Sequence, residues 1–359
     1  MRVGIVTQPL EMNYGGILQN WALQQVLKRL GHDPITIDGY ERFSTPHYVF
    51  NYARAALSRL IGKKRYYPRR YCGAMRSENT GRFIENQIIK THVMWDYKPS
   101  VVRRYRLDAI VVGSDQVWRY NFNRFHYEQM YLKFAAKTHL KKRVAYAASF
   151  GNDNWECPPE RTPGCVDLVK LFDAVSVREE SAIKLCRDNL GVDAVRVLDP
   201  TLLLDAKDYA GIIDKEWKVE EPFLAVYCLD LSPSKEAFFN QLAEEHGLKV
   251  MHFSSGWRSA LTVEQWLAIF SNASMVVTDS FHGTVFSILF RKNFYSICNP
   301  FRGRTRMAGL LEQLGLEQRL VSNTDPHEPD NREINWDDVY ARLNEQRKFS
   351  VDFLANNLK

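Results

Sequence analysis

The segment T-D-S-F-H-G-T (278–284) holds a histidine, His282, beside Asp279, Ser280 and Gly283. Histidine is the side chain best suited to proton transfer near neutral pH, because its pKa lies close to that pH. The serine and aspartate stand too near it in sequence to be assumed a hydrolase triad, and no G-x-S-x-G elbow supports one. We therefore expect His282 to transfer a proton or to hydrogen-bond an anion, and a structural histidine is the alternative.

Two arginine motifs could hold an anion. Arg178 follows an apolar run in D-A-V-S-V-R-E-E, and its guanidinium offers a bidentate fork to a carboxylate or phosphate. An ion pair with Glu179 or Glu180 is the structural alternative. The segment N-P-F-R-G-R-T-R brings three arginines together within five residues, which suits an anionic ligand or an exposed loop: Arg302, Arg304 and Arg306.

Four segments combine glycine with serine, aspartate or asparagine where a predicted strand gives way to a loop or helix. These segments are N-Y-G-G, V-V-G-S-D-Q-V-W, Y-A-A-S-F-G and the histidine segment. Such turns can present backbone N–H groups to an anion, helped by the dipole of a following helix. A tight turn explains any one of them, but four together favour a ligand cleft. The substrate-binding candidates are Asn13, Gly15, Gly16, Ser114, Asp115, Ser149, Asp279, Ser280, Gly283 and Thr284.

The elements that must position these residues alternate between short β-rich runs and helical patterns, which predicts parallel sheets covered by helices. The first set of strands is Arg2–Thr7, Pro34–Ile37, Asp108–Val112, Arg143–Ser149, Asp173–Val177 and Val195–Leu198. A second set restarts after L-D-P-T-L-L-L, with Phe223–Leu229, Lys249–Phe253, Met275–Thr278 and Phe294–Ile297. Helices are expected between them, notably Gly16–Leu30, Glu179–Leu190, Lys235–His246, Val263–Ser271 and Gly283–Phe290.

This alternation predicts an α/β chain of two Rossmann-like domains that face each other across a cleft, where ligands bind at the carboxyl ends of the strands. We expect an N-terminal domain over residues 1–205, a C-terminal domain over 206–334 and one or two helices over 335–359. Residues 44–98 match no pattern and form a basic insertion in the first domain.

Composition and missing motifs restrict the function further. The 359 residues carry a net charge of +6, and no apolar run is long enough to span a membrane. The six cysteines are scattered, which is typical of a cytoplasmic protein with reduced thiols. The sequence lacks G-x-G-x-x-G, a phosphate-binding P-loop, H-E-x-x-H and D-x-D. We therefore expect a reaction on an anionic small molecule without metal or cofactor, and no nucleic-acid partner.

Taken together, the segments N-Y-G-G-I-L-Q-N-W-A-L-Q, V-V-G-S-D-Q-V-W, Y-A-A-S-F-G, S-V-R-E-E-S-A, L-D-P-T-L-L-L and T-D-S-F-H-G-T-V-F-S-I resemble, in this order, the polysaccharide pyruvyl transferase family. The resemblance spans roughly Val3 to Leu316. It implies a fold like that of B-type glycosyltransferases. It also implies transfer of pyruvate from phosphoenolpyruvate onto two hydroxyls of a sugar, free or lipid-linked, which gives a cyclic ketal and phosphate. His282 and Arg178 match the residues that matter for activity in the family, and a further basic residue after the last strand helps to bind the donor.

This chemistry agrees with the residues. Phosphoenolpyruvate needs a proton on its methylene carbon so that C2 becomes electrophilic, and a positioned imidazolium could supply it, a role typically worth about 10²–10⁴-fold in rate. Arginines and helix N-termini would hold the carboxylate and phosphate. Asp115 and Asp279 are the candidates for the base that activates the sugar hydroxyls. The rival functions are a glycosyltransferase that uses a nucleotide sugar and a non-catalytic sugar- or phosphate-binding module.

One segment remains outside this interpretation. Residues 44–77 contain no aspartate or glutamate but hold eight basic residues, namely Arg54, Arg59, Lys63, Lys64, Arg65, Arg69, Arg70 and Arg76. Apolar residues between Tyr48 and Ile61 recur at helical spacing. A basic amphipathic helix can lie on an anionic membrane surface, which would place the protein at the inner face of the membrane. A core-packing helix with a solvated basic flank is the alternative.

Overall fold

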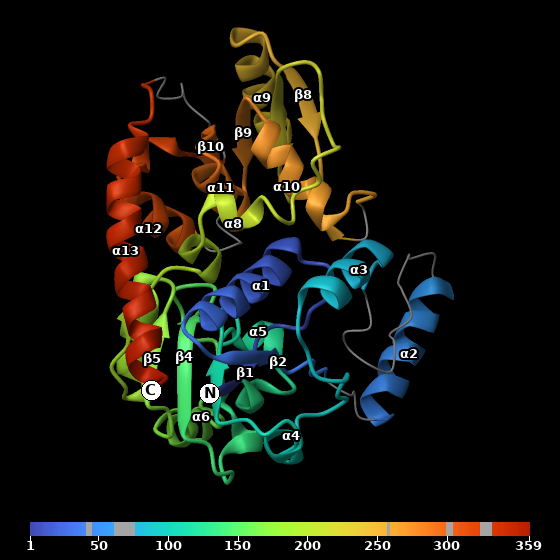
Figure 1. Ribbon diagram of the computed structural model, residues 1–359. Coiled ribbons are helices and arrows are strands. Elements are labelled where there is room, and N and C mark those ends of the chain that lie inside the picture. Colours follow the sequence, from blue (N-terminus) through green and yellow to red (C-terminus); the bar gives the residue numbers. More distant parts are fainter. Residues whose placement is uncertain (41–44, 61–75, 257–258, 299–303, 324–331) are drawn as a thin grey trace.

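The computed structural model contains two parallel β-sheets, one in each half of the chain, with helices around both (Figure 1). It describes the chain except for residues 41–44, 61–75, 257–258, 299–303 and 324–331. In the six-stranded sheet the strand order is β2-β1-β3-β4-β5-β6, and in the five-stranded sheet it is β11-β10-β9-β7-β8. Every strand pair is parallel, so all the carboxyl ends in a sheet lie at one edge.

The first sheet forms from apolar runs that helices bury on both faces, as parallel strands require. The strands β3 and β4 illustrate this, because all four residues of β3 and the last five of β4 are buried. The strands are β1 (Arg2–Val6), β2 (Asp33–Thr36), β3 (Ala109–Val112), β4 (Lys142–Ala148), β5 (Ala174–Val177) and β6 (Val195–Arg196). The main helices around it are α1 (Tyr14–Arg29), α3 (Glu78–Gln87), α4 (Ser100–Arg104), α5 (Tyr120–Asn123), α6 (Thr162–Val169) and α7 (Glu180–Leu185).

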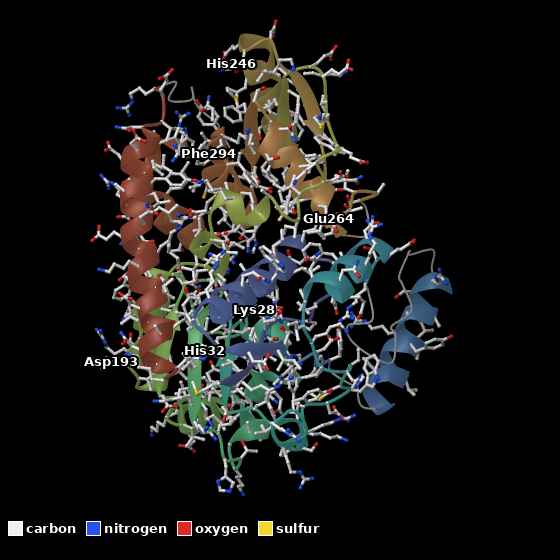
Figure 2. The ribbon with its side chains drawn as sticks, viewed as in Figure 1. Lys28, His32, Asp193, His246, Glu264 and Phe294 are labelled. Atoms are coloured by element: carbon white, nitrogen blue, oxygen red, sulfur yellow. The ribbon has the colours of Figure 1, made fainter. Side chains whose placement is uncertain are left out.

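The second sheet is built in the same way. Its strands are β7 (Phe223–Tyr227), β8 (Lys249–His252), β9 (Met275–Thr278), β10 (Asn293–Ile297) and β11 (Leu320–Val321). Its helices are α9 (Pro233–Glu245), α10 (Val263–Asn272), α11 (Phe281–Leu289) and α12 (Arg304–Leu314). Figure 2 shows Phe294 of β10 inside this half of the molecule, whereas His246 lies at its surface, in agreement with their burial.

The two halves share one hydrophobic core, so the position of one sheet relative to the other is fixed by packing. Trp21 of α1 contacts Tyr209 at the end of α8 (Ala206–Tyr209), and Tyr209 in turn packs edge-on against Phe286 of α11. Tyr14 packs against Trp266 of α10 and donates a hydrogen bond to the carbonyl of Leu261 (2.6 Å). These side chains belong to a single cluster of buried residues.

The C-terminal helix α13 (Trp336–Asn357) runs from the second half back along the first (Figure 1). Arg347 of this helix donates to the carbonyls of Leu202 (2.6 Å) and Leu204 (2.8 Å), and Ser350 accepts from the N–H of Leu198 (3.0 Å). The helix thus fixes the segment that follows β6, the last strand of the first sheet.

The predicted strands all appear, with ends that differ by at most two residues. The helix predicted from Gly16 begins at Tyr14 because Asn13 caps it. The helix predicted over Glu179–Leu190 changes after Leu185 into a π-helical turn that ends at Gly191, where φ is +66°. The sequence did not predict α12, because its apolar periodicity is weak near the arginines. No helix in the described ranges is both long and apolar enough to cross a membrane.

The basic insertion contains α2 (Thr45–Leu60) and α3. The basic residues Lys63, Lys64, Arg65, Arg69 and Arg70 lie outside the described residues. Arg76 binds the buried carboxylate of Asp38 (2.7 Å) and the Tyr40 hydroxyl (2.6 Å) just beyond β2. The end of the insertion is therefore anchored on the first sheet.

Candidate active site

A cavity of about 690 Å³ lies between the two halves, at the carboxyl ends of both sheets. Six segments reach it: the turn before α1, the loop after β3, the loop after β7, the loop after β8, the turn between β9 and α11, and the first turn of α12. The lining residues are Asn13, Asp115, Gln116, Arg119, Phe122, Tyr227, Leu229, Asp230, Ser255, Asp279, Ser280, Phe281, His282 and Arg306. The cavity thus stands where open α/β sheets bind their ligands.

Two helix N-termini, one from each half, open onto this cavity. The Asn13 side chain accepts the N–H of Gly16 (3.2 Å) and caps α1, and Ser280 accepts the N–H of Gly283 (3.4 Å) and caps α11. Both capping residues line the cavity. Because the N-terminal end of a helix carries a partial positive charge and unpaired N–H groups, this arrangement favours an anionic ligand.

His282 lies in the first turn of α11, directly against the first turn of α1 from the other half. Its side chain is 10% exposed, and its Nε2 atom lies 3.9 Å from Asp199 Oδ2 without a hydrogen-bond partner among the described residues. Burial lowers the pKa of His282, and the charges of Arg178 and Arg306 act in the same direction against those of Asp199 and Asp115. The neutral imidazole therefore predominates at pH 7 while the cavity holds no ligand.

Gly15 makes the close approach of His282 possible. A methyl group at Gly15 would come within 2.8 Å of the His282 Cβ atom and would overlap the imidazole ring. Gly283, on the other side of the histidine, has a similar constraint, because a methyl group there would come within 2.9 Å of the Thr278 Cβ atom. The two glycines allow the histidine to sit between the helices.

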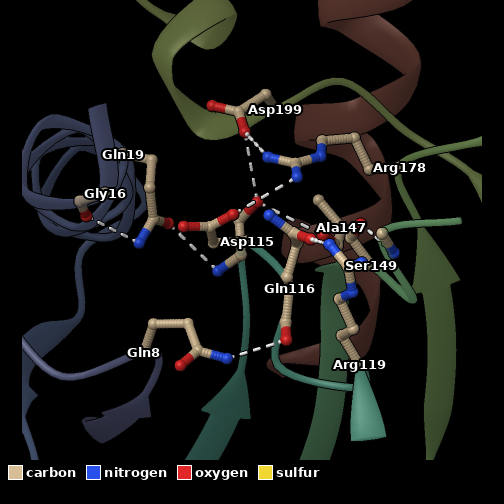
Figure 3. A network of polar contacts seen from close by, with 12 residues as sticks. Gln8, Gly16, Gln19, Asp115, Gln116, Arg119, Ala147, Ser149, Arg178 and Asp199 are labelled. Atoms are coloured by element: carbon tan, nitrogen blue, oxygen red, sulfur yellow. Dashed lines mark hydrogen bonds and ion pairs between the residues drawn. The ribbon is translucent and has the colours of Figure 1, made fainter. Parts of the chain in front are cut away.

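Arg178 lies behind the cavity wall, held by two buried carboxylates (Figure 3). It donates to Asp199 Oδ2 (2.7 Å) and reaches Asp115 Oδ1 (3.4 Å), and its guanidinium lies 4.7 Å from the centre of the Phe281 ring. Burial alone would raise the pKa of Asp199, but Arg178, His282 and Thr201 hold it below its usual value. The arginine thus links the β3 loop that carries Asp115 to the segment after β6.

Arg306 is the described member of the predicted arginine cluster that reaches the cavity. Burial and the nearby charge of Arg178 lower its pKa to about 10, so it stays cationic at neutral pH. The structure describes the backbone of Arg304 in α12 but not its side chain, and Arg302 lies outside the described residues. A second cation at the cavity is Arg119, which donates to Gln116 Oε1 (2.8 Å) and covers the Phe122 ring (4.4 Å).

Asp279 lines the cavity, yet its carboxylate already holds the loop after β7. It accepts the N–H groups of Leu229 (2.6 Å) and Asp230 (3.2 Å) and pairs with the buried Lys235 (2.7 Å). Asp115 also lines the cavity, and its ion pair with Arg178 (3.4 Å) is longer than the pair between Asp279 and Lys235 (2.7 Å). Asp115 is therefore the better placed candidate for a base. Its backbone is left-handed, with φ of +72°, a conformation that often marks functional positions.

The remaining predicted site residues do not line the cavity; Thr284 bonds to the lining residue Ser280, whereas the partners of Ser114 and Ser149 do not line it. Ser114 donates to the Ala147 carbonyl (3.2 Å) and to Asp199 (3.3 Å), and Ser149 donates to Glu179 (2.9 Å). Thr284 donates to the Ser280 carbonyl (3.2 Å).

Several residues of this site were not predicted from the sequence. Asp199 stands in the L-D-P-T-L-L-L segment, and its position directly after a short strand was the available signal. Gln116, Arg119 and Phe122 follow β3 in the same way, but nothing in their spacing showed that they face the second half of the chain. Among the described residues, no cluster of three or more acidic, histidine or cysteine side chains could hold a metal ion.

Comparison with known proteins gives one family and a shared fold. The family model described as polysaccharide pyruvyl transferase matches residues 13–299. A putative UDP-N-acetylglucosamine 2-epimerase from Listeria monocytogenes shares 10% identity with a TM-score of 0.51, over 99% of this chain and 90% of its own. The structure of MnaA with UDP from S. aureus shares 14% identity with a TM-score of 0.50, over 100% of this chain and 96% of its own. No curated protein sequence matches this chain. The two Rossmann-like domains thus form a fold similar to that of B-type glycosyltransferases, as the sequence predicted.

Proposed function

Because this chain belongs to the polysaccharide pyruvyl transferase family, we propose that it transfers pyruvate from phosphoenolpyruvate onto two hydroxyls of a sugar and forms a cyclic ketal. The observation that carries the proposal is the meeting of His282, Arg306 and two helix N-termini at one cavity. Phosphoenolpyruvate carries a carboxylate and a phosphate, and these buried positive groups can hold both. The acceptor is a sugar of a polysaccharide or of a lipid-linked precursor, and no cofactor takes part.

The reaction begins with proton delivery by His282. When the donor is bound, its negative charges replace water around the imidazole and raise its pKa from the lowered value of the free cavity. The imidazolium then gives its proton to the methylene carbon of phosphoenolpyruvate, and the C2 atom gains oxocarbenium character. Arg306 stabilises the negative charge of the phosphate as it leaves.

The acceptor supplies both new C–O bonds. Its first hydroxyl attacks C2 and loses its proton to a base, for which Asp115 is our candidate. The bond from C2 to the phosphate oxygen then breaks, inorganic phosphate leaves, and the second hydroxyl closes the ring with loss of its proton. The sum of these steps is one phosphoenolpyruvate and one diol converted into one ketal and one phosphate.

Arg178 supports this chemistry from behind the wall. By binding Asp199 and Asp115 at the same time, it fixes the carboxylate that faces His282 and the carboxylate proposed as the base. We therefore assign Arg178 and Asp199 as positioning residues, and we assign the direct contact with the donor to Arg306.

The experiment is a reaction in D₂O with phosphoenolpyruvate and a panel of glycans from polysaccharide-producing cells. Proton delivery from solvent predicts phosphate release together with a ketal whose methyl group carries one deuterium, seen by NMR and mass spectrometry. The same panel with UDP-N-acetylglucosamine tests the rival activity, since the related solved structures include one bound to UDP. Release of UDP without any reaction of phosphoenolpyruvate would assign the cavity to a glycosyltransferase. Binding of phosphoenolpyruvate without turnover on any acceptor would favour a binding module.

A further inference from the structure

Helix α2 exposes an apolar face to solvent. Val49 is 58% exposed, Phe50 64%, Tyr52 46% and Leu57 63%, whereas Ala55 is 2% exposed. At 100° per residue, the four exposed residues lie on one arc of the helix, and Ala55 points away from that arc. The helix therefore contacts the protein through its small side and turns its large apolar residues outward.

The described side chains of α2 do not fit the core-packing alternative, which would bury its large apolar residues. Figure 1 shows the helix at the outer edge of the N-terminal half, and it makes no extended contact with another described helix or strand. Single exposed apolar residues are common on protein surfaces, but a continuous apolar face of this kind marks an interaction surface.

The charge of the same segment identifies the kind of partner. Arg54 and Arg59 are exposed and lie on the two flanks of the apolar arc. Residues 44–77 carry eight basic and no acidic residues, whereas the whole chain has a net charge of only +6. The rest of the chain therefore has a slightly negative net charge, and the excess of positive charge of this protein lies in residues 44–77.

We propose that α2 docks the protein on an anionic phospholipid surface. The apolar arc enters the boundary between headgroups and acyl chains, and Arg54 and Arg59 reach the phosphates on either side. A second copy of the chain fits this face poorly, because a two-fold axis would bring two segments of strong positive charge together. This proposal is independent of the reaction, since it involves neither the cavity nor the donor.

The experiment is co-sedimentation of the full chain with vesicles of phosphatidylcholine alone or mixed with phosphatidylglycerol. We expect binding to the anionic vesicles only, and loss of that binding as salt is raised. Arg54→Gln with Arg59→Gln should weaken binding by about 30-fold, because each basic residue near an anionic surface contributes about a factor of five. Phe50→Gln with Leu57→Gln should weaken it by about tenfold or more.

Matched controls lie elsewhere on the surface. Phe349→Gln removes a 50% exposed aromatic residue of α13, and Lys141→Gln with Lys249→Gln removes two exposed charges of other elements. These variants should bind like the parent chain. Binding to neither kind of vesicle, or equal binding to both, would overturn the proposal. So would a parent chain that dimerises without binding vesicles and becomes monomeric in the Phe50→Gln, Leu57→Gln variant, because α2 would then be a dimer interface.

Discussion

Replacing Gly15 by alanine should inactivate the protein without unfolding it. Gly15 lies in the first turn of α1, and none of its backbone angles requires glycine. The obstacle is His282 alone, since a methyl group there would come within 2.8 Å of the histidine Cβ and closer still to the ring. Carbon atoms in contact prefer separations of about 3.5–4.0 Å. The imidazole must therefore move by roughly 1 Å or more.

The size of the effect follows from that displacement. A misplacement of about 1 Å at the reacting atoms can cost about 10²-fold in rate, so we expect kcat for phosphate release to fall by about two orders of magnitude. The free energy of unfolding should fall by no more than about 2 kcal/mol, because the overpacking cost of about 1–3 kcal/mol is partly offset by the roughly 1 kcal/mol advantage of alanine in a helix. Steady-state phosphate release and a thermal melt measure the two quantities separately.

A second glycine provides the matched control. Gly81 lies in α3, and the nearest atom to a methyl group there is the Arg76 Cβ at 4.0 Å. Gly81→Ala should keep full turnover and melt at a slightly higher temperature. If Gly15→Ala turned over phosphoenolpyruvate as fast as Gly81→Ala, the role assigned to the position of His282 would be wrong.

Four further predictions concern the residues around the cavity. His282→Asn should lower kcat by about 10²–10⁴-fold while phosphoenolpyruvate still binds in calorimetry, and normal turnover would remove His282 from the mechanism. In the parent chain, kcat/KM for phosphoenolpyruvate should fall as the pH rises through the pKa of His282 in the free cavity, because the imidazole loses its proton; this pKa lies below the ordinary value of about 6.5. The kcat should fall at a higher pH, because the bound donor raises the pKa of His282. If kcat and kcat/KM fell at the same pH, this prediction would be wrong. Arg178→Lys should be almost as inactive as Arg178→Ala, since a single ammonium group cannot bridge Asp199 and Asp115; a lysine variant with parental kcat would show that the bridge is not needed. Asp199→Asn should lower thermal stability, because it leaves Arg178 without its closest carboxylate, and should shift the pH profile of kcat/KM to lower pH, a shift that loss of stability alone would not produce.

The sequence predicted the fold and the motifs of the site because both depend on local patterns. Apolar runs such as those of β3 and β9 give the strands directly, and glycine with asparagine or serine gives the turns that follow them. His282 and Asn13 were found in this way, since each stands at a turn where a strand leads into a helix. Parallel topology then places the carboxyl ends of the strands at one edge. A cavity at that edge could therefore be predicted, but its shape could not.

The roles of individual residues could not be predicted, because they depend on contacts between distant parts of the chain. Arg178 and Arg306 both follow predicted strands, yet Arg178 lies behind the cavity wall and Arg306 lines it. The difference comes from Asp199 and Asp115, which lie 21 and 63 residues away in sequence and hold the Arg178 guanidinium. The sequence likewise indicates that Asp279 is an active-site carboxylate, but in the structure it pairs with the buried Lys235.

In the proposed mechanism, the charges of the cavity require the donor itself to complete the active site. In the free cavity, the charges of Asp199 and Asp115 are matched by those of Arg178 and Arg306, and burial disfavours a proton on His282. The histidine is therefore poorly protonated until a negatively charged ligand arrives next to it. The donor's charge favours the imidazolium at the same time as it brings the methylene carbon that accepts the proton. A neutral sugar cannot provide this charge, so the proposed mechanism predicts an order of events: the donor binds and His282 takes up its proton before the acceptor reacts.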